Sequence, residues 1–255
     1  MSEVYLLSKF FFKELIYRKI FFVAMGIGLA FVVLSMLLGP LSYSEESRLA
    51  VNFSLSGSQI ALIFLSVLVG ADFIKADIES QSIHSFLARP ITRFQYYFSK
   101  FSAFAFCLLF LTFVMWLGFF IIALMLGMEE SLISFVPYLG IYIEALVLFS
   151  FALMVSLFSS SLLAVGASFT LFLVGHWVDV FKFLVEKSTS VFVKVIGFIL
   201  SKGIPNLESL NWKSHLTYGE WMPAFNYMKF SAYGFSWVFF ILLVGYFIFS
   251  KKDFS

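Results

Sequence analysis

The stretch Lys75–Lys100 reads KADIESQSIHSFLARPITRFQYYFSK, the longest clearly water-facing segment between strongly apolar runs in the first half of the chain. Pro90 lacks a backbone N–H and pushes Arg89 out of the helical region, so the stretch predicts a helix, a break and a second helix. The apolar runs on either side have the length of membrane spans. A short helix held between two spans would offer a partner protein a rigid contact to both of them.

Composition decides the broad class. The chain of 255 residues is 61% apolar and 21% aromatic, with only 13% charged residues. So little charge cannot cover the surface of a soluble protein of this size, and the sequence therefore predicts an all-α integral membrane protein. The net charge of +2 provides no argument for binding nucleic acid. The single cysteine, Cys107, excludes an intramolecular disulfide and a cysteine-cluster metal site.

Six apolar segments are predicted to cross the membrane, and the first of them has about the 20 helical residues that a bilayer core requires. Gly39-Pro40 ends the first of them, and the acidic pair Glu129-Glu130 follows the third. No internal repeat divides the chain, so we expect a single transmembrane domain over residues 1–255. The predicted spans cover residues 20–38, 59–74, 101–126, 136–158, 162–180 and 233–249.

Residues 1–19 predict an amphipathic helix that lies in the membrane interface. Phe11 and Leu15 fall on one side of this helix, and Lys9 and Lys13 lie nearly opposite. Basic side chains can then meet lipid headgroups while the apolar side sinks inwards. The alternative is the start of a signal peptide, but no small-residue cleavage site follows the apolar run.

The segment 181–232 is neither cleanly apolar nor disordered in composition. Its first part carries Lys182, Glu186, Lys187 and Lys194, and each such charge costs roughly 2.5–3.5 kcal/mol near the centre of a spanning helix. We therefore predict one or two amphipathic helices along the outer interface, in a long and partly helical outer segment.

The basic residues predict the orientation. If six spans alternate from an inner N-terminus, the short outer loops hold only Arg48, which agrees with the excess of Lys and Arg on the cytoplasmic side. Both termini and residues 75–100 would then face the cytoplasm, with the chain in the cytoplasmic membrane. The inner segments hold Lys9, Lys13, Arg18, Lys19, Lys75, Arg89, Arg93, Lys100, Lys251 and Lys252.

Motifs for catalysis are missing from the sequence. No Gly-Lys pair occurs, so the chain has no phosphate-binding loop with which to hydrolyse ATP. No HExxH is present, and His84, His176 and His215 are scattered, so we predict no metal site and no catalytic residue. A membrane-embedded enzyme is the least favoured class.

Three short motifs are similar to those of a known family. After Glu79, the loop shows Ser82-Ile83, Phe86-Leu87, Arg89-Pro90-Ile91-Thr92-Arg93 and then Lys100, with Gln81 and Ser82 where the family has a glycine. A Pro-Asn-Leu stretch starts at Pro205, and the chain closes with Lys252-Asp253-Phe254. Together with six spans, these motifs resemble the permease subunit of a type-2 ABC transporter, of the copper-enzyme maturation and gliding-motility types.

The resemblance implies a dimer of two permease chains, each docked through residues 75–100 onto a separate ATPase that carries ATP and Mg²⁺. ATP binding would close the ATPase dimer, and the loop helix would carry this motion into the second and third spans. Export, or mechanical signalling to a periplasmic or surface partner, would follow. The residues implied in this coupling loop are Glu79, Ser82, Leu87, Arg89, Pro90, Arg93 and Lys100.

A second function class is open. The chain would then be a membrane scaffold that transports nothing and anchors partners on the outer face. Ordinary solvated loop charges, which also satisfy the inside-positive bias, would account for Glu79, Arg89 and Arg93. An ATPase bound to residues 75–100 distinguishes the transporter from the scaffold.

Glu144 is the only acidic residue well inside a predicted span. A carboxylate within the membrane is costly and suggests a possible intramembrane polar site, for a proton, an ion, a substrate or a bond between chains. The alternative is a protonated or locally bonded side chain that faces a neighbouring helix, and the sequence leaves both open. His176 and Asp179 are three residues apart and could pair on one helix face.

Overall fold

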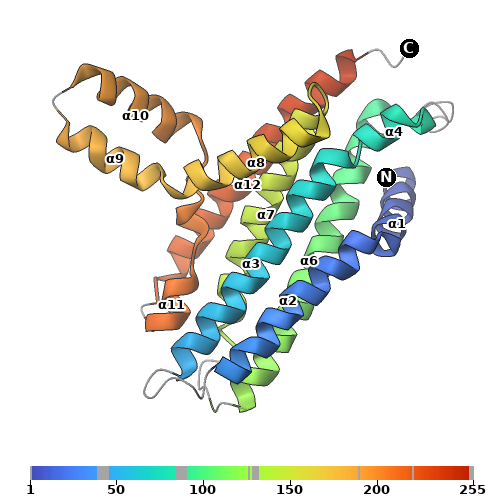
Figure 1. Ribbon diagram of the computed structural model, residues 1–255. Helices are drawn as coiled ribbons and strands as arrows, with labels where there is room; N and C mark the ends of the chain where they lie inside the picture. Colours follow the sequence, from blue (N-terminus) through green and yellow to red (C-terminus); the bar gives the residue numbers. More distant parts are fainter. Residues whose placement is uncertain are drawn as a thin grey trace.

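The computed structural model describes residues 2–38, 46–83, 91–125, 127, 132–188, 190–219 and 221–252. Figure 1 shows that this part of the chain is a bundle of long helices with a helical arm at one side. No strand occurs among the described residues. The predicted all-α class is therefore confirmed.

Five helices are long and apolar enough to cross a membrane. A sixth candidate arises if α8 (Ser161–His176) and α9 (Val178–Lys187), which bend by 52° at their junction, count as one span. Such a set of apolar helices fits a protein that crosses a membrane several times. The five are α2 (Lys19–Leu38), α3 (Glu46–Asp72), α6 (Arg93–Met125), α7 (Phe135–Ser156) and α12 (Ala224–Lys251).

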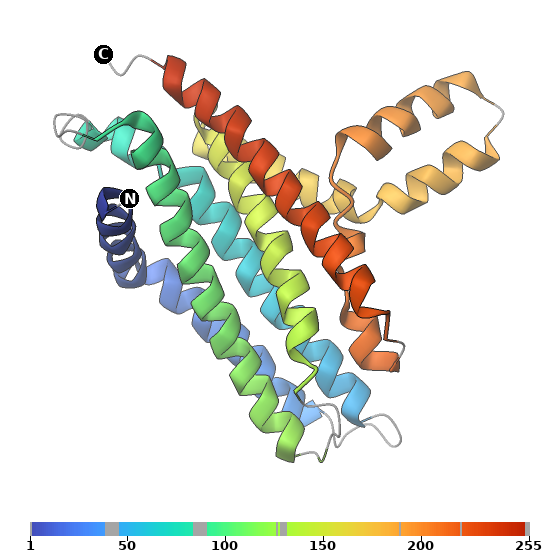
Figure 2. The same cartoon turned by 180° about the vertical axis from the view of Figure 1, so that it is seen from behind.

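The centre of the bundle is formed by α3 and α7, which are mostly buried, whereas α2 and α12 expose most of their side chains. Aromatic packing ties α6 to this centre, since the rings of Phe104 and Phe149 stack with centroids 3.9 Å apart. Both termini and α4 (Lys75–Glu79) lie toward one end of the bundle, and α11 (Lys213–Tyr218) lies toward the other (Figures 1 and 2). We call these the inner end and the outer end, after the orientation that the sequence predicts.

The N-terminal helix α1 (Ser2–Tyr17) packs along α6. Phe11 and Leu15 are buried in this contact, and Lys9 and Lys13 are exposed on the other side, which is the division that helical spacing predicts. The chain bends at Arg18 before α2 begins.

Three helices begin earlier than their predicted spans. α3 begins at Glu46 instead of residue 59, because Val51 and Leu55 are buried in the bundle and extend its apolar face. α6 begins at Arg93 instead of residue 101. Thr92 and Gln95 explain this start, since the backbone N–H of Gln95 donates to Oγ1 of Thr92 at 3.2 Å and the N–H of Thr92 donates back to Oε1 of Gln95 at 2.9 Å. This is a capping box.

The third early start is that of α12, which begins at Ala224 instead of residue 233. Pro223 precedes it with extended backbone geometry, φ −54° and ψ 141°, and marks the entry into the helix. α7, at Phe135–Ser156, lies within two residues of the predicted 136–158 at both ends.

The predicted straight span over residues 162–180 differs most from the structure, because α8 ends at His176. The backbone N–H of Leu207 donates to the carbonyl of Gly175 at 3.0 Å, so the returning chain crosses α8 at this point. A side chain at position 175 would lie 2.7 Å from Cγ of Leu207, which is why glycine suits the crossing. The long-range contact explains the bend.

Beyond this bend, α9 and α10 (Val191–Gly203) form a helical hairpin that projects sideways from the bundle (Figures 1 and 2). The chain then returns through the short helix η2 (Glu208–Leu210) to α11. The predicted outer segment 181–232 thus contains a projecting arm and a part that packs on α3 and α7.

Candidate functional site

Two clusters of polar and aromatic side chains lie between the helices, each around one fully buried charged residue, Lys100 in one and Glu144 in the other. The inner junction consists of Phe11, Phe73, Asp77, Tyr96 and Lys100, at the inner end. The outer network consists of Gln59, Glu144, His176, Glu208 and Lys213, in the outer half. Each cluster joins elements that are far apart in the sequence.

The inner junction is centred on Lys100, which is fully buried in α6. Its ammonium donates to the carbonyl oxygen of Phe73 at 2.7 Å and forms an ion pair with Oδ2 of Asp77 at 2.7 Å. Tyr96 also donates its hydroxyl to Oδ2 of Asp77. A buried charge is tolerated only when it is paired and hydrogen-bonded, and here both conditions are met.

Aromatic rings complete the surroundings of the Lys100 ammonium. The nitrogen lies 4.1 Å from the ring centroid of Phe73 and 4.7 Å from that of Phe11, which is within the range of cation–π attraction. Phe11 belongs to α1, Phe73 to the turn after α3, and Asp77 to α4. The inner junction therefore connects the N-terminal helix, the loop helix and two bundle helices through one side chain.

The other predicted coupling residues have different surroundings. Glu79 projects from α4 with 68% of its side chain exposed, 3.9 Å from Lys75. Ser82 accepts a hydrogen bond from the hydroxyl of Ser80 at 3.1 Å, close to the end of α4. Three of the predicted residues lie outside the described part of the chain: Leu87, Arg89 and Pro90.

Arg93 is turned toward the bundle. Its Nη1 donates to the carbonyl oxygen of Ser250 at 2.6 Å and to that of Lys252 at 3.1 Å, so it binds the C-terminal end of α12. Cations are favourable there because the last carbonyls of a helix have no partner within the helix. Arg93 thus has a structural contact that the sequence reading did not predict.

Further contacts tie the inner ends of the helices together. Lys75 donates to the carbonyl of Ser159 at 2.9 Å, and Ser161 donates to Oδ1 of Asp72 at 2.7 Å. The first contact joins α4 to the turn between α7 and α8, and the second joins the end of α3 to the start of α8. α4 is therefore attached to the bundle on two sides.

The outer network is centred on Glu144, which is fully buried in α7 about 14 Å along the helix from Phe135. Nε2 of Gln59 donates to Oε2 of Glu144 at 2.8 Å, and the ammonium of Lys213 donates to Oε1 of Gln59. The amide of Gln59 therefore lies between the carboxyl group and the cation. Lys213 comes from α11, so this chain of contacts fastens the outer segment to α3 and α7.

His176 connects the same carboxyl group to the other part of the outer segment. Its Nε2 lies 3.5 Å from Oε1 of Glu144 and 3.8 Å from Oε2 of Glu208. Oε1 of Glu144 has no hydrogen bond within the described residues, because 3.5 Å is an ion-pair distance and longer than a well-formed hydrogen bond. The hydrogen bonding of the buried charge is therefore less complete in the outer network than in the inner junction.

The tautomer of His176 follows from its other nitrogen. Nδ1 lies 3.1 Å from the carbonyl oxygen of Phe172, and since a carbonyl only accepts, Nδ1 carries a proton. A neutral ring then presents a bare Nε2 to Glu144. Two states fit this geometry, a neutral histidine beside a protonated Glu144 and an imidazolium beside its carboxylate, so one proton can serve either group.

Lys213 lies at the start of α11, outside the long apolar helices. Burial lowers the pKa of Lys213 from its ordinary value, and the carboxylates of Glu144 and Glu208 oppose this shift. Desolvation is the larger effect because the cation meets Glu144 through Gln59 and not in direct contact.

The predicted pair of His176 and Asp179 does not form. Asp179 instead accepts hydrogen bonds from Lys182 at 2.6 Å and from Nδ2 of Asn206 at 2.9 Å, because the bend at Trp177 turns α9 away from α8. Sequence reasoning singled out Glu144 and His176 but not the contact between them, and it missed Gln59, Glu208 and Lys213. Helical spacing could not have found this network, since its members come from five different elements.

Within the described residues, no group of three or more His, Cys, Asp and Glu side chains could hold a metal ion. The chemistry available at the outer network is ion pairing and proton sharing. The inner junction offers a mechanical connection between helices.

The apolar helices and the two buried charge clusters define a helical membrane protein with several candidate spans. Neither the comparison with protein-family models nor that with curated proteins finds a match to this chain.

Proposed function

We propose that this chain is the membrane-spanning permease subunit of an ATP-driven ABC transporter. It would cross the cytoplasmic membrane six times, with both termini in the cytoplasm. A second permease chain would complete a dimer, and a separate ATPase subunit would bind ATP and Mg²⁺ and dock on residues 75–100.

The observation that supports this proposal most is the inner junction. A coupling element has to move as a unit with the helices that it drives, and Asp77 of α4 binds Lys100 of α6 at 2.7 Å. Lys100 in turn binds the end of α3 through the carbonyl of Phe73. A force applied to α4 would therefore reach both neighbouring candidate spans without passing through a flexible linker.

The surface of α4 supports the same proposal. Ser80, Gln81 and Glu79 are exposed at the inner end of the bundle, so they are accessible to a partner. ATP binding would favour one arrangement of the ATPase dimer, and the docked loop would bias the arrangement of the bundle accordingly. α1 would move with α6, because Phe11 lies against the Lys100 ammonium.

At the outer end, η2 and α11 would transmit the movement, since Lys213 and Glu208 connect them to α3, α7 and α8. The transporter would then export a substrate or pass a mechanical signal to a partner on the outer face.

Copurification tests this function. We expect a phosphate-loop ATPase to copurify in stoichiometric amount from native membranes in mild detergent, identified by mass spectrometry. The double variant Glu79→Arg with Arg89→Glu keeps the net charge of the loop and reverses its pattern, so it should reduce the bound ATPase at least about tenfold. Arg93 is unsuitable for this test, because it binds the end of α12.

The matched control is Glu186→Arg with Lys187→Glu, an equivalent charge reversal at two exposed positions of α9. The control should retain the ATPase. Absence of any ATPase from the wild-type preparation, together with a stable partner on the outer face, would contradict the proposal and favour a scaffold.

A further inference from the structure

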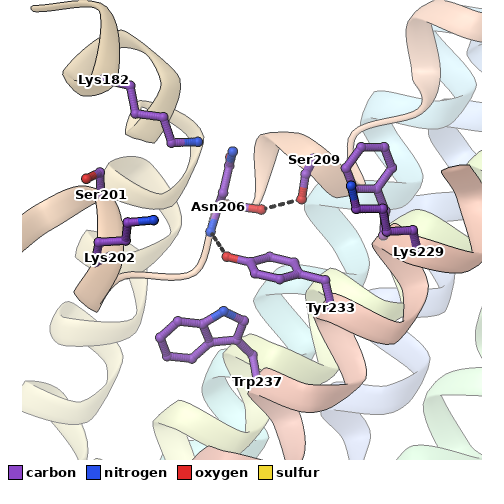
Figure 3. Close-up of a pocket in the computed structure, with 9 residues that line it drawn as sticks. Lys182, Ser201, Lys202, Asn206, Ser209, Lys229, Tyr233 and Trp237 are labelled. Atoms are coloured by element: carbon purple, nitrogen blue, oxygen red, sulfur yellow. Dashed lines mark hydrogen bonds between the residues drawn. The ribbon is translucent and has the colours of Figure 1, made fainter. Parts of the chain in front are cut away.

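A pocket lies between the α9–α10 hairpin and α12, outside both charge clusters (Figure 3). It has a volume of about 310 Å³ and is open on one side. Its walls come from α9, α10, the returning chain before η2, and α12, so it exists only because the hairpin folds back beside the last helix. The residues that give it chemical character are Lys182, Lys202, Asn206, Lys229, Tyr233 and Trp237.

The pocket carries an excess of positive charge. Lys182 and Lys202 extend toward Asn206 from the hairpin, and Lys229 lies on the opposite side (Figure 3). Asp179 neutralises Lys182 at 2.6 Å. Lys202 and Lys229 form no ion pair with any described residue, so two of the three ammonium groups are available to an anion.

Hydrogen-bonding groups are also available. Tyr233 accepts the backbone N–H of Asn206 at 2.9 Å, which leaves its hydroxyl hydrogen for another acceptor. Oδ1 of Asn206 is buried and accepts no hydrogen bond from the described residues, while its Nδ2 is used by Asp179. A buried acceptor without a donor is costly, and a ligand hydroxyl would satisfy it.

The surroundings of the pocket suit a polar headgroup at the membrane surface. Trp237 and Tyr233 are neighbours on α12, with ring centroids 6.5 Å apart, and such amphipathic rings gather at the level of lipid headgroups. Phe198 on α10 and Phe240 on α12 are 62% and 57% exposed, so the helices that line the pocket also carry exposed aromatic side chains. This arrangement accommodates acyl chains below a polar headgroup.

We propose that the pocket binds a phosphate that carries a neighbouring hydroxyl group, as in the headgroup of a glycerophospholipid or in free glycerol phosphate. Lys202 and Lys229 bind the phosphate, Tyr233 donates to it, and Oδ1 of Asn206 accepts from the hydroxyl. The inference does not rest on the ATPase, because it concerns the isolated chain and can be tested without any partner.

The test uses phosphatidylglycerol as the probe. The purified chain is placed in phosphatidylcholine nanodiscs that contain a small fraction of phosphatidylglycerol. The protein is then released from the nanodisc, and native mass spectrometry counts the lipids that each chain retains. Lys202→Gln with Lys229→Gln should lower the retained phosphatidylglycerol at least about tenfold, since each basic side chain near an anionic lipid favours its binding about fivefold. Both lysines are exposed and unpaired within the described structure, so the fold does not depend on them.

The matched control is Lys187→Gln with Lys194→Gln, which removes two exposed lysines from the same hairpin without changing the pocket. It should retain phosphatidylglycerol at the wild-type level. Equal retention by the pocket variant and this control, or equal binding of phosphatidylcholine and phosphatidylglycerol by the wild type, would overturn the proposal.

Two further measurements identify the source of the ligand and the role of the hydroxyl. If the ligand is soluble, glycerol phosphate should bind to the lipid-free wild-type protein in detergent. The pocket variant should then bind it roughly tenfold less, as it does phosphatidylglycerol. Glycerol phosphate should fail to displace phosphatidylglycerol if the ligand is a lipid. Phosphatidic acid, which has the phosphate but no headgroup hydroxyl, should be retained less than phosphatidylglycerol, and greater retention would contradict the contact with Asn206.

Discussion

The inner junction and the outer network both bury charge between helices, but they satisfy it differently. Lys100 contacts Asp77 directly and also a carbonyl and two rings, so the ion pair is closed. Glu144 meets the nearest ammonium only through an amide, and one of its oxygens accepts no hydrogen bond from the described residues. The first arrangement is fully paired, whereas the second leaves one carboxyl oxygen of Glu144 facing His176 at 3.5 Å.

The difference separates two mechanical roles. A closed ion pair resists change because removing either partner leaves an uncompensated buried charge. The inner junction is therefore suited to transmit a displacement of α4 without loss. The outer network has a proton that either His176 or Glu144 can carry, so under the proposed function it would suit an outer segment that rearranges against α3 and α7.

The largest expected effect comes from opening the inner junction. Lys100→Met leaves the Asp77 carboxylate without its cation in a buried site, and should destabilise the protein by roughly 3–5 kcal/mol. The fraction of folded protein that survives stepwise heating in mild detergent measures this loss. Lys13→Met is the control, because Lys13 is exposed on α1.

A second substitution distinguishes lost charge pairing from general damage. Asp77→Asn added to Lys100→Met removes the orphaned charge and should recover part of the lost stability. If Lys100→Met survives heating as well as Lys13→Met, the inner junction is not the rigid connection described above.

An intermediate effect, dependent on pH, is expected at the outer network. Because burial lowers the pKa of Lys213, the unfolded chain holds a proton that the folded protein has lost at alkaline pH, and stability rises as the pH increases. Lys213→Met should cost about 1–2 kcal/mol at neutral pH, through the lost hydrogen bond to Gln59. The difference from the wild type should widen as the pH approaches about 10, the ordinary lysine range.

Lys229→Met provides the comparison for this measurement, since it removes an exposed lysine from α12. Unfolding in mixed micelles over a series of pH values gives both curves. A constant difference between the wild type and Lys213→Met across the series would show that Lys213 does not titrate in the folded protein in this way.

The smallest effect is expected at the end of α4. Gln81 has φ 56°, in the left-handed region that glycine adopts without steric cost. Gln81→Gly should therefore stabilise the protein by about 1 kcal/mol in the same heating assay. Ser80→Gly is the matched control, because Ser80 has an ordinary φ of −81° and gains nothing from glycine; equal stability of the two variants would contradict the prediction.

Local patterns predicted much of the fold. The apolar composition predicted a helical membrane protein, and the spacing of Phe11 and Leu15 predicted the buried side of α1. Thr92 and Gln95 also carried a local signal, since the capping box sets the start of α6. The predicted span, which starts at residue 101, leaves this signal out.

The partners of the buried charges had no such signal. Lys100 was predicted as a coupling residue of the loop, and the structure buries it against α1, α4 and the end of α3. The surroundings of Glu144 involve Gln59, 85 residues earlier, and Lys213, which lies in a segment of different composition.

The sequence by itself determined the helical class, the apolar segments and the presence of a costly acid at Glu144, because composition and helical periodicity are properties of neighbouring residues. Only the tertiary structure decided that α8 bends at Trp177, that Lys100 closes the inner junction, and that the hairpin forms a basic pocket beside α12. Each of these depends on contacts between elements distant in the chain. Burial and pairing of charge are set by those contacts, and no local pattern records them.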